Sequence, residues 1–371
     1  VNSFAVRLPS VVFGLLSIIG LYLLTLELTK KKSIALLSSF LFSITPWFFI
    51  FSRTGYEATA GLAFFIWAIY FLLSSSNHKF LIFISTFLFV VSAYSYNSFR
   101  ILTPIVLGLG LLYHLHKKQF AIVLLSGLML IASALPMYKL YKQDSGLSRL
   151  QSVGSTAVIG NYFKNFSPKY LFISGDTNPR SQVPEKSQLY FIDSIFLILG
   201  IIYIVRSKNP KLYLILGLLL FAPIPAAITK ENPHALRTIL MSPVLSTITA
   251  FGIYTLTKEK KLFLGLVIST YLIFFGNYYF NFVTEYNDLS KSAWQYEYKE
   301  IFKNKKEGCV SDEFAQPYIF GLFYGVDDEQ SSYNKVDPNY FISTRVLNPV
   351  NDWGFSTVKS FGNYTFSKKC D

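Results

Sequence analysis

Ten apolar stretches separated by short polar connections fill residues 5–283, and a polar tail follows them. A helix that crosses a bilayer needs roughly 20 mostly apolar residues, because hydrocarbon offers no hydrogen-bond partner to the backbone. Nearly all of these stretches are too long for a soluble core helix, so the pattern predicts an α-helical polytopic membrane protein. The predicted spans are residues 9–28, 33–51, 58–74, 80–95, 100–114, 119–138, 189–205, 211–228, 236–256 and 262–283, of which 100–114 is the shortest.

The composition agrees with a membrane protein, since 52% of the residues are hydrophobic, 18% are aromatic and only 15% are charged. The net charge of +13 could suggest a nucleic-acid partner. The basic residues, however, cluster in short loops between the apolar spans, where they act as topology signals. We therefore expect the lipid bilayer, and no nucleic acid, as the partner of these charges.

The basic residues predict how the chain is oriented in the membrane. The loops after spans one, three, five, seven and nine contain twelve of them: Lys30, Lys31, Lys32, Lys79, Lys117, Lys118, Arg206, Lys208, Lys211, Lys258, Lys260 and Lys261. The alternate short loops contain four: Arg53, Arg100, Lys230 and Arg237. Because basic loops stay in the cytoplasm, we expect a multi-pass protein of the cell membrane with the long segment 139–188 and the tail outside the cytoplasm.

Two domains are predicted, a transmembrane domain at residues 1–283 that includes the external loop 139–188, and an extracytoplasmic domain at residues 284–371. Residues 309–311, 317–324 and 364–367 resemble short strands with helical links, so we expect a small α/β or β-rich fold in the tail. Cys309 and Cys370 lie there, where a disulfide is permitted, and both a bridge and two separate thiols remain open. No charged segment with a cleavage site precedes the first span, so no signal peptide is expected.

Charged residues gather where the predicted spans meet the outer surface. A charge in the middle of a span costs about 2.5–3.5 kcal/mol on insertion scales, so charges near hydrocarbon usually have a function. These residues are Arg7 at the start of the first span, Arg53 and Glu57 between spans two and three, and Arg100 before span five.

The connection between spans eight and nine contains Pro233, His234 and Arg237. Proline favours the start of a helix, which would place His234 and Arg237 on one face of the first turn. Free N–H groups together with a bidentate cation would then bind a phosphate. The alternative is that Arg237 only extends its charge to the membrane surface.

Two further groups carry alternative interpretations. Glu57 could act as a general base, or it could neutralise the nearby arginines. Asp176, Asn178 and Arg180 in the outer loop could bind a substrate hydroxyl or a cation, or they could form an ordinary turn.

Metal ligation has little support in the sequence. The four histidines are scattered, and there is no CxxC, HExxH or GxxxxGK[ST] motif. We therefore predict no metal site and no certain cofactor, and a divalent cation is the one cofactor left open.

Several of these segments together resemble one family, the bacterial GT-C glycosyltransferases, which include protein O-mannosyltransferases and aminoarabinose transferases. The segments are Ala5-Val6-Arg7-Leu8-Pro9-Ser10, Ser52-Arg53 with Glu57, residues 94–100, and Asn232-Pro233-His234-Ala235-Leu236-Arg237. The likeness runs through nearly the whole chain, including residues 172–176 and 316–324. No single motif decides the resemblance, which depends on their order and their side of the membrane.

The resemblance implies a membrane enzyme of the cell envelope that takes a sugar from a polyprenyl phosphate carrier. The acceptor would be a protein, lipid or glycan at the extracytoplasmic face. In such enzymes the principal catalytic carboxylate lies in an external loop directly before the Arg-Leu-Pro-Ser span, and we expect that loop upstream of Val1. Glu57 matches the position of a second acidic residue in the aminoarabinose transferases.

The expected mechanism is a single displacement at the anomeric carbon, with inversion. A carboxylate would deprotonate the acceptor hydroxyl, while Arg237 and His234 would stabilise the leaving phosphate. Arg53 and Arg100, and then Arg7, are alternatives for this role. Two other functions remain open: a lipid-linked saccharide transporter or flippase, and a catalytically inactive membrane scaffold. A transporter would favour internal repeats and midspan charges, whereas the charges here lie at the outer surface.

Overall fold

A computed structural model describes residues 3–76, 78–142, 154–291, 293, 294, 296, 340–343, 355–361 and 364–369. The chain divides into two compact units. One comprises Arg7–Val283, and the other comprises Val1–Val6 together with Thr284–Asp371.

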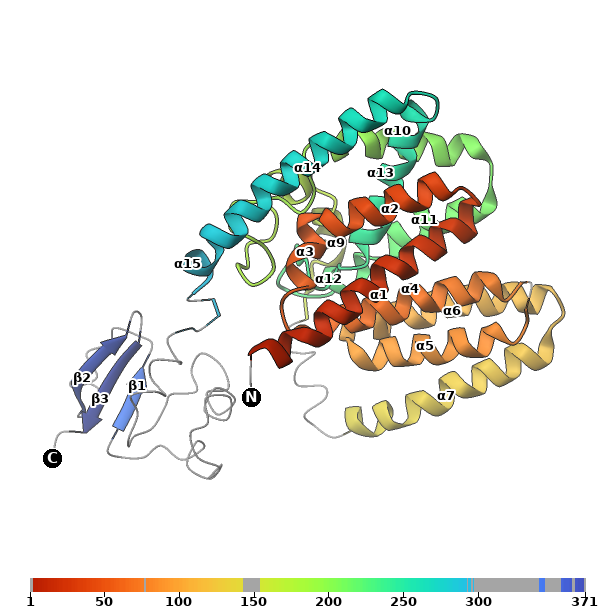
Figure 1. Ribbon diagram of the computed structural model, residues 1–371. Coiled ribbons are helices and arrows are strands. Elements are labelled where there is room, and N and C mark those ends of the chain that lie inside the picture. The colour runs from red at the N-terminus through yellow and green to blue at the C-terminus, as the bar shows by residue number, and fades with distance from the viewer. Residues whose placement is uncertain are drawn as a thin grey trace. The chain divides into compact units, whose positions relative to one another are not determined.

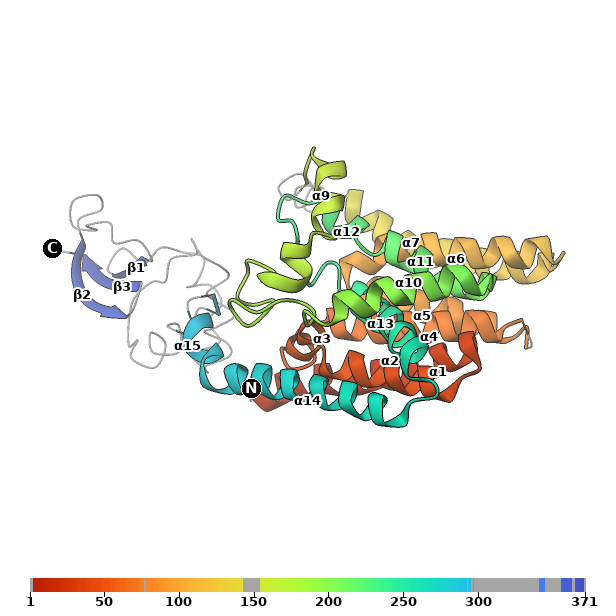
Figure 2. The same cartoon turned by 90° about the horizontal axis from the view of Figure 1, so that it is seen from above.

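The larger unit is a bundle of helices, most of which lie roughly side by side (Figures 1 and 2). Its helices, with the first beginning four residues before the unit, are α1 Ser3–Thr29, α2 Lys32–Ile44, α3 Pro46–Phe51, α4 Ala58–Ser74, α5 Leu81–Ser95, α6 Asn97–His116, α7 Phe120–Lys142, α9 Val158–Lys164, the π-helix η1 Lys169–Ile173, α10 Asp193–Ser207, α11 Pro210–Phe221, α12 Ile224–Ala227, α13 Met241–Thr257 and α14 Lys261–Thr284.

Every predicted span contains a helix, but two of the spans are interrupted. The span predicted at 33–51 is divided because α2 ends at Ile44, Thr45 is extended, and α3 begins at Pro46. A proline disfavours helical geometry in the residue before it and lacks an N–H, so Pro46 ends one helix and starts the next. The span predicted at 211–228 is divided near Pro223 into α11 and α12, although Ala222 and Pro223 both keep helical backbone angles.

Five of the described helical stretches are long and apolar enough to cross a membrane. They are Ser3–Thr29, Asn97–His116, Phe120–Lys139, Pro210–Ala227 and Lys261–Thr284. The shorter apolar helices α2, α4 and α5 accompany them. The molecule is therefore a helical membrane protein.

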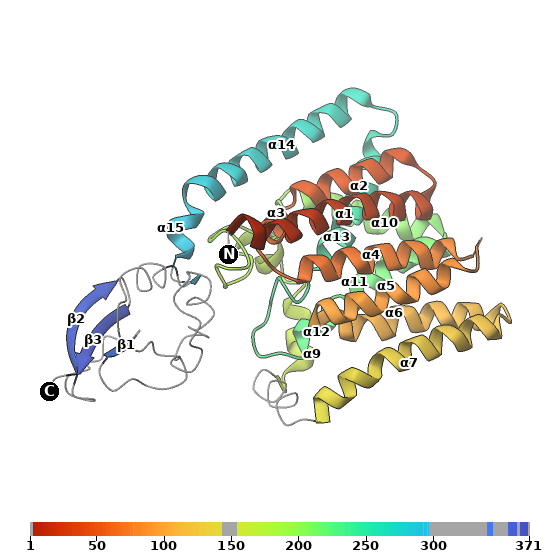
Figure 3. The same ribbon diagram turned by 60° about the horizontal axis from the view of Figure 1, so that its bottom comes forward.

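The two ends of the bundle differ in their connections. The links α1–α2, α4–α5, α6–α7, α10–α11 and α13–α14 lie at one end, and α3, α9 and α12 lie toward the other (Figure 3). The twelve basic residues counted above lie in these five links or in the helix ends beside them. The alternation of charge along the chain is thus an alternation between the two ends of one bundle.

Helices α10 and α13 approach each other closely because each has a glycine at the contact. A methyl group on Gly252 would lie 2.0 Å from the carbonyl oxygen of Phe196, and one on Gly200 would lie 1.9 Å from that of Ile248. Small residues permit this approach between membrane helices, where dispersion contacts supply much of the attraction. The site described below directly precedes α13, so this contact supports it.

The described residues of the smaller unit contain a short helix, α15 Tyr286–Ser290, and three strands. The strands are β1 Tyr340–Ser343, β2 Phe355–Phe361 and β3 Tyr364–Lys369, and they form an antiparallel sheet in the order β1-β3-β2. The strand predicted at 364–367 lies within β3. Residues 309–311 and 316–324, Cys309 and Cys370 lie outside the described residues, so the class of the whole tail stays a prediction.

We expect Gly252→Ala to lower the thermal unfolding midpoint, because overpacking a well-packed contact typically costs about 1–3 kcal/mol. Gly265→Ala in α14 is the matched control, since its new methyl group would meet no atom within 4 Å. Thermal unfolding of the detergent-solubilised variants compares the two. Equal midpoints would contradict a tight α10–α13 contact.

Candidate functional site

The candidate site is built on residues 229–240, between α12 and α13. The helix predicted to start near residue 236 begins only at Met241, so the prediction that His234 and Arg237 share the first turn of that helix is wrong. Pro233 follows a cis peptide bond, and no helix starts there. The segment instead contains turns, such as the one in which Thr238 N–H donates to the carbonyl of His234 at 3.2 Å.

Interactions with distant parts of the chain explain this local structure. The N–H of Ala235, which was expected to be free at a helix start, donates to Asp176 Oδ2 at 2.7 Å. The carbonyl of the same residue accepts from Trp47 Nε1 at 3.0 Å. The expected cradle of free backbone N–H groups is therefore absent at Ala235, and phosphate binding here would depend on side chains.

Arg237 presents a partly exposed guanidinium group. Its Nη1 donates to Thr229 Oγ1 at 2.8 Å and to the carbonyl of Glu231 at 3.2 Å. Its Nη2 donates to Glu231 Oε2 at 3.3 Å, and 22% of the Arg237 side chain is exposed. Glu231 is 71% exposed and was not singled out in the sequence analysis, although it lies only six residues before Arg237.

His234 lies between two carboxylates. Its Nε2 is 3.6 Å from Glu231 Oε2, and its Nδ1 is 3.9 Å from Asp176 Oδ2. Burial is the main cause that lowers the pKa of His234 to about 3, and the positive charge of Arg237 is the second cause. The imidazole is therefore neutral near pH 7, and it can exchange a hydrogen bond with a ligand but adds no positive charge to the site.

Asp176 and Asn178 direct their side-chain oxygens to backbone donors. Besides the bond from Ala235, Asp176 Oδ1 accepts from Asn178 N–H at 2.9 Å, and Asn178 Oδ1 accepts from Arg180 N–H at 3.0 Å. Asp176 is buried, and burial raises the pKa of its carboxyl group. This geometry is that of the turn alternative, and a substrate contact of these residues stays a prediction.

Arg53 and Glu57 lie on either side of the α3–α4 connection. The guanidinium of Arg53 lies 3.5 Å from the centre of the Phe49 ring, and its Nη1 donates to Ser52 Oγ at 2.9 Å. Glu57 is exposed immediately before α4, and its carbonyl accepts from Gly61 N–H at 3.1 Å. Within the described chain the two form no ion pair, so Glu57 does not neutralise Arg53 directly.

The charges of Glu57 and Arg237 both act on the side chain of Tyr96. This residue lies at the extended break between α5 and α6. Burial raises the pKa of its phenol, the charge of Arg237 opposes that shift, and the charge of Glu57 adds to it. Both charges therefore act on one side chain. The sequence analysis included Tyr96 only as part of residues 94–100. The short gap between the spans predicted at 80–95 and 100–114 was the signal that could have singled it out.

The remaining predicted arginines have other surroundings. Arg100 Nε donates to the carbonyl of Ala93 at 3.2 Å. Arg7 is exposed on α1, and Arg180 is partly buried in the segment between η1 and α10. The structure thus joins His234 and Arg237 through Glu231 by short contacts. Glu57 is related to Arg237 only through the effects of both charges on Tyr96, and none of the described contacts adds Arg7 or Arg53.

No group of three or more His, Cys, Asp or Glu side chains in the described residues could hold a metal ion. His114, one of the scattered histidines, is buried and bonded on both ring nitrogens, with Ser75 Oγ at 2.9 Å and Gln119 Oε1 at 2.7 Å. Both nitrogens of His114 are therefore used in hydrogen bonds within the bundle.

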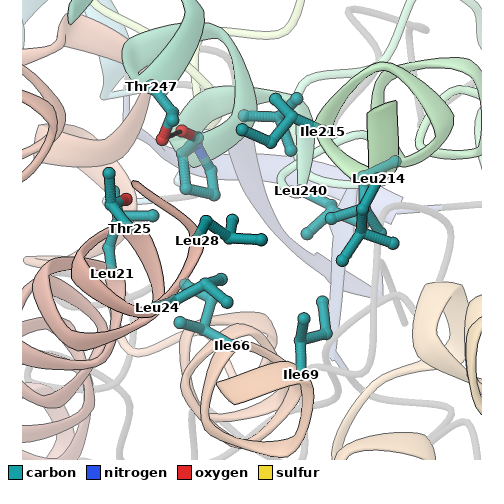
Figure 4. Close-up of a pocket in the computed structure, with 13 residues that line it drawn as sticks. Leu21, Leu24, Thr25, Leu28, Ile66, Ile69, Leu214, Ile215, Leu240 and Thr247 are labelled. Atoms are coloured by element: carbon teal, nitrogen blue, oxygen red, sulfur yellow. Dashed lines mark hydrogen bonds between the residues drawn. The ribbon is translucent and has the colours of Figure 1, made fainter. Parts of the chain in front are cut away.

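A small apolar pocket lies elsewhere in the bundle, between α1, α4, α11 and α13 (Figure 4). Its free volume of about 20 Å³ has room for little more than one water-sized group. Leucine, isoleucine, valine and proline line it, with only Thr25 and Thr247 as polar residues. The pocket has neither the size nor the charge to bind a sugar phosphate.

Comparison with known proteins gives a match to a protein family. The chain matches no curated protein. A protein-family model described as dolichyl-phosphate-mannose-protein mannosyltransferase matches residues 1–138. That region holds α1 to α7 up to residue 138, with Glu57 and Tyr96, but not residues 229–240. Together with the membrane-crossing helices, the match supports a membrane glycosyltransferase of the GT-C type.

Proposed function

We propose that this protein transfers a sugar from a polyprenyl phosphate carrier to an acceptor, a protein being the first choice, at the extracytoplasmic face. The observation that carries the proposal is the cluster of Arg237, Glu231 and His234 at one end of a helical membrane unit, with the charges of Arg237 and Glu57 both acting on Tyr96. The family match to residues 1–138 supports the same chemistry, because the name of that family includes a lipid-phosphate sugar donor and a protein acceptor.

The orientation follows from the two ends of the bundle. About ten helical segments cross or enter the membrane in this proposal, and the end with the twelve basic residues faces the cytoplasm. The end with α3, α9 and α12, and the candidate site near them, then faces outward (Figure 3). By the same alternation of basic loops, the C-terminal tail after the last predicted span is proposed to lie outside the cytoplasm. A donor at that face would have to be lipid-linked, since nucleotide sugars are absent there.

Arg237 is the proposed binding group for the carrier phosphate. Its guanidinium is held by Glu231, whose side chain is 71% exposed. An exposed ion pair contributes only about 0–1 kcal/mol, so a phosphate can displace the carboxylate at small cost. Two parallel N–H groups would then bind two phosphate oxygens, with neutral His234 as a neighbouring hydrogen-bond partner.

Glu57 is the proposed base within this chain. In the transfer step its carboxylate takes the proton of the acceptor hydroxyl, whose oxygen forms the new bond to the anomeric carbon. The bond from that carbon to the phosphate oxygen breaks, and its electron pair stays on the phosphate beside Arg237. Stabilising that developing charge is where fixed donors lower a barrier most. The residue upstream of Val1 that the resemblance implies is the alternative base.

A transporter for lipid-linked saccharides would need a polar pathway through the bundle. The pocket between α1, α4, α11 and α13 is small and uncharged, and the charged groups lie at the end of the bundle. These observations favour transfer at the outer surface. No described feature specifically favours an inactive scaffold.

The orientation predicts opposite labelling of two engineered cysteines. In a background with Cys309→Ser and Cys370→Ser, Ser360→Cys in β2 should react with an impermeant maleimide on intact cells. Lys118→Cys, between α6 and α7, should react only after lysis. The reverse pattern would overturn the orientation and place the site on the cytoplasmic side.

The donor class is tested with the full-length protein in proteoliposomes. We expect transfer from polyprenyl phosphate mannose to cell-envelope acceptors, measured by release of polyprenyl phosphate and mass of the product. Nucleotide sugars should give no transfer, because the site offers a cation and no nucleotide-binding motif. Turnover of a nucleotide sugar without turnover of the lipid donor would contradict the proposal.

The roles of Arg237 and Glu57 separate in one experiment. Arg237→Ala should abolish transfer and weaken binding of polyprenyl phosphate, and Arg237→Lys should recover only part, because a point charge replaces a planar fork. Glu57→Gln should retain binding of that lipid and lose at least about 100-fold in kcat, within the usual range for general base catalysis.

Binding, kcat and thermal stability are measured for each of these variants. A well-folded Arg237→Ala protein with normal lipid binding would remove Arg237 from the site, and full rescue by lysine would support the surface-charge alternative. An unchanged kcat in Glu57→Gln would move the base to another residue.

A further inference from the structure

Both backbone groups of Ala235 are bound by side chains from distant parts of the chain. Asp176 accepts from its N–H at 2.7 Å across 59 positions, and Trp47 donates to its carbonyl at 3.0 Å across 188 positions. Ala235 itself is fully buried. It lies directly after His234 and two residues before Arg237, so these two bonds fix the backbone from which both side chains extend.

The segment around Ala235 depends on such bonds because it lacks a helix. Between Thr229 and Met241 the described backbone bonds are those of turns, such as Thr238 N–H to the His234 carbonyl at 3.2 Å and Met241 N–H to the Thr238 carbonyl at 2.8 Å. A regular helix would set the direction of each side chain by its own geometry. Here that direction is set by the groups that bind the backbone from outside.

The two groups that bind Ala235 are themselves connected. Asp176 N–H donates to Gln182 Oε1 at 2.6 Å, and the amide of Gln188 donates to the same oxygen at 2.9 Å. The carbonyl of Gln188 accepts from Trp47 N–H at 3.2 Å. A continuous chain of hydrogen bonds therefore connects Asp176 to Trp47 through Gln182 and Gln188. Gly175, with φ +64°, permits the tight approach of Gln182. Asp176 and Trp47 therefore form one preorganised clamp.

Both oxygens of the Asp176 carboxylate accept hydrogen bonds from the backbone. One oxygen accepts from Ala235 N–H, the other accepts from Asn178 N–H at 2.9 Å, and the side chain is 3% exposed. A buried carboxylate with backbone donors on both oxygens would lose strong hydrogen bonds if it turned to a ligand. Its geometry suits the support of the segment rather than contact with a sugar.

We propose that Asp176 and Trp47 are positioning residues, which hold Ala235 and thereby direct the Arg237 guanidinium toward the carrier phosphate. This inference rests on the proposed function, since it assigns the clamp to the same phosphate site. It gives Asp176 a role in the reaction that operates through Arg237 and involves no contact with the reacting atoms.

The test compares Asp176→Asn and Trp47→Phe with the unmodified full-length protein. Asparagine can accept only one of the two backbone bonds, and phenylalanine removes the Nε1 donor while keeping an aromatic ring. A displacement of about 1 Å in a binding group can reduce a rate about 100-fold. We expect each variant to weaken polyprenyl phosphate binding by about 10- to 100-fold and to raise KM for polyprenyl phosphate mannose by a similar factor.

Asp193→Asn is the matched control. Asp193 is another buried carboxylate, which accepts from Tyr271 Oη at 2.6 Å and from Tyr190 N–H at 2.8 Å, and no described contact joins it to Arg237. It should share any general loss of thermal stability with Asp176→Asn but keep its KM. Equal changes in KM and stability for both variants would overturn the positioning role.

A double variant supplies the second readout. In an Arg237→Ala background, Asp176→Asn should weaken lipid binding no further, because the group that it positions is already gone. Additive losses would overturn the inference. If the unmodified protein binds no polyprenyl phosphate, the proposed function itself fails, whereas normal binding by Asp176→Asn beside impaired binding by Arg237→Ala rejects only the inference.

Discussion

The hydrogen bonds to Ala235 are the interactions on which the candidate site depends. Most of the larger unit satisfies its backbone within helices, as hydrocarbon requires. Residues 229–240 do not, and an irregular segment at the end of a membrane bundle needs partners from elsewhere in the protein. Asp176 and Trp47 supply these partners, so the backbone beside Arg237 is held by the segment between η1 and α10 and by the helix after the break at Thr45.

The dependence of residues 229–240 on distant hydrogen-bond partners shows how far the sequence could predict the fold. The apolar stretches identified the helices because length and apolarity are properties of each stretch alone. The interruption at Pro46 had a local cause that was also available, a proline that disfavours helix in the preceding residue. The start of α13 at Met241 had no such local cause. Pro233 is a good first residue for a helix, and contacts from residues 59 and 188 positions away override that preference.

The site was predictable to a similar degree. The cost of charge near hydrocarbon directed attention to the ends of the spans, and Glu231 lay within the segment that contained His234 and Arg237. The association of Tyr96 with Glu57 and Arg237 is tertiary, and no spacing in the sequence indicates it. The neutral state of His234 could not be predicted either, because burial sets it. The surroundings of Arg53 are local by contrast, since it contacts Phe49, which lies four residues earlier in the sequence.

The glycine contact between α10 and α13 also restricts the path of a lipid. With Gly200 and Gly252 at the interface, each helix leaves no room even for a methyl group against the carbonyl of the other. An isoprenoid chain whose headgroup lay beside Arg237 could not pass between these two helices. It would have to leave along a face of the bundle where long side chains, which can change rotamer, meet the surrounding membrane.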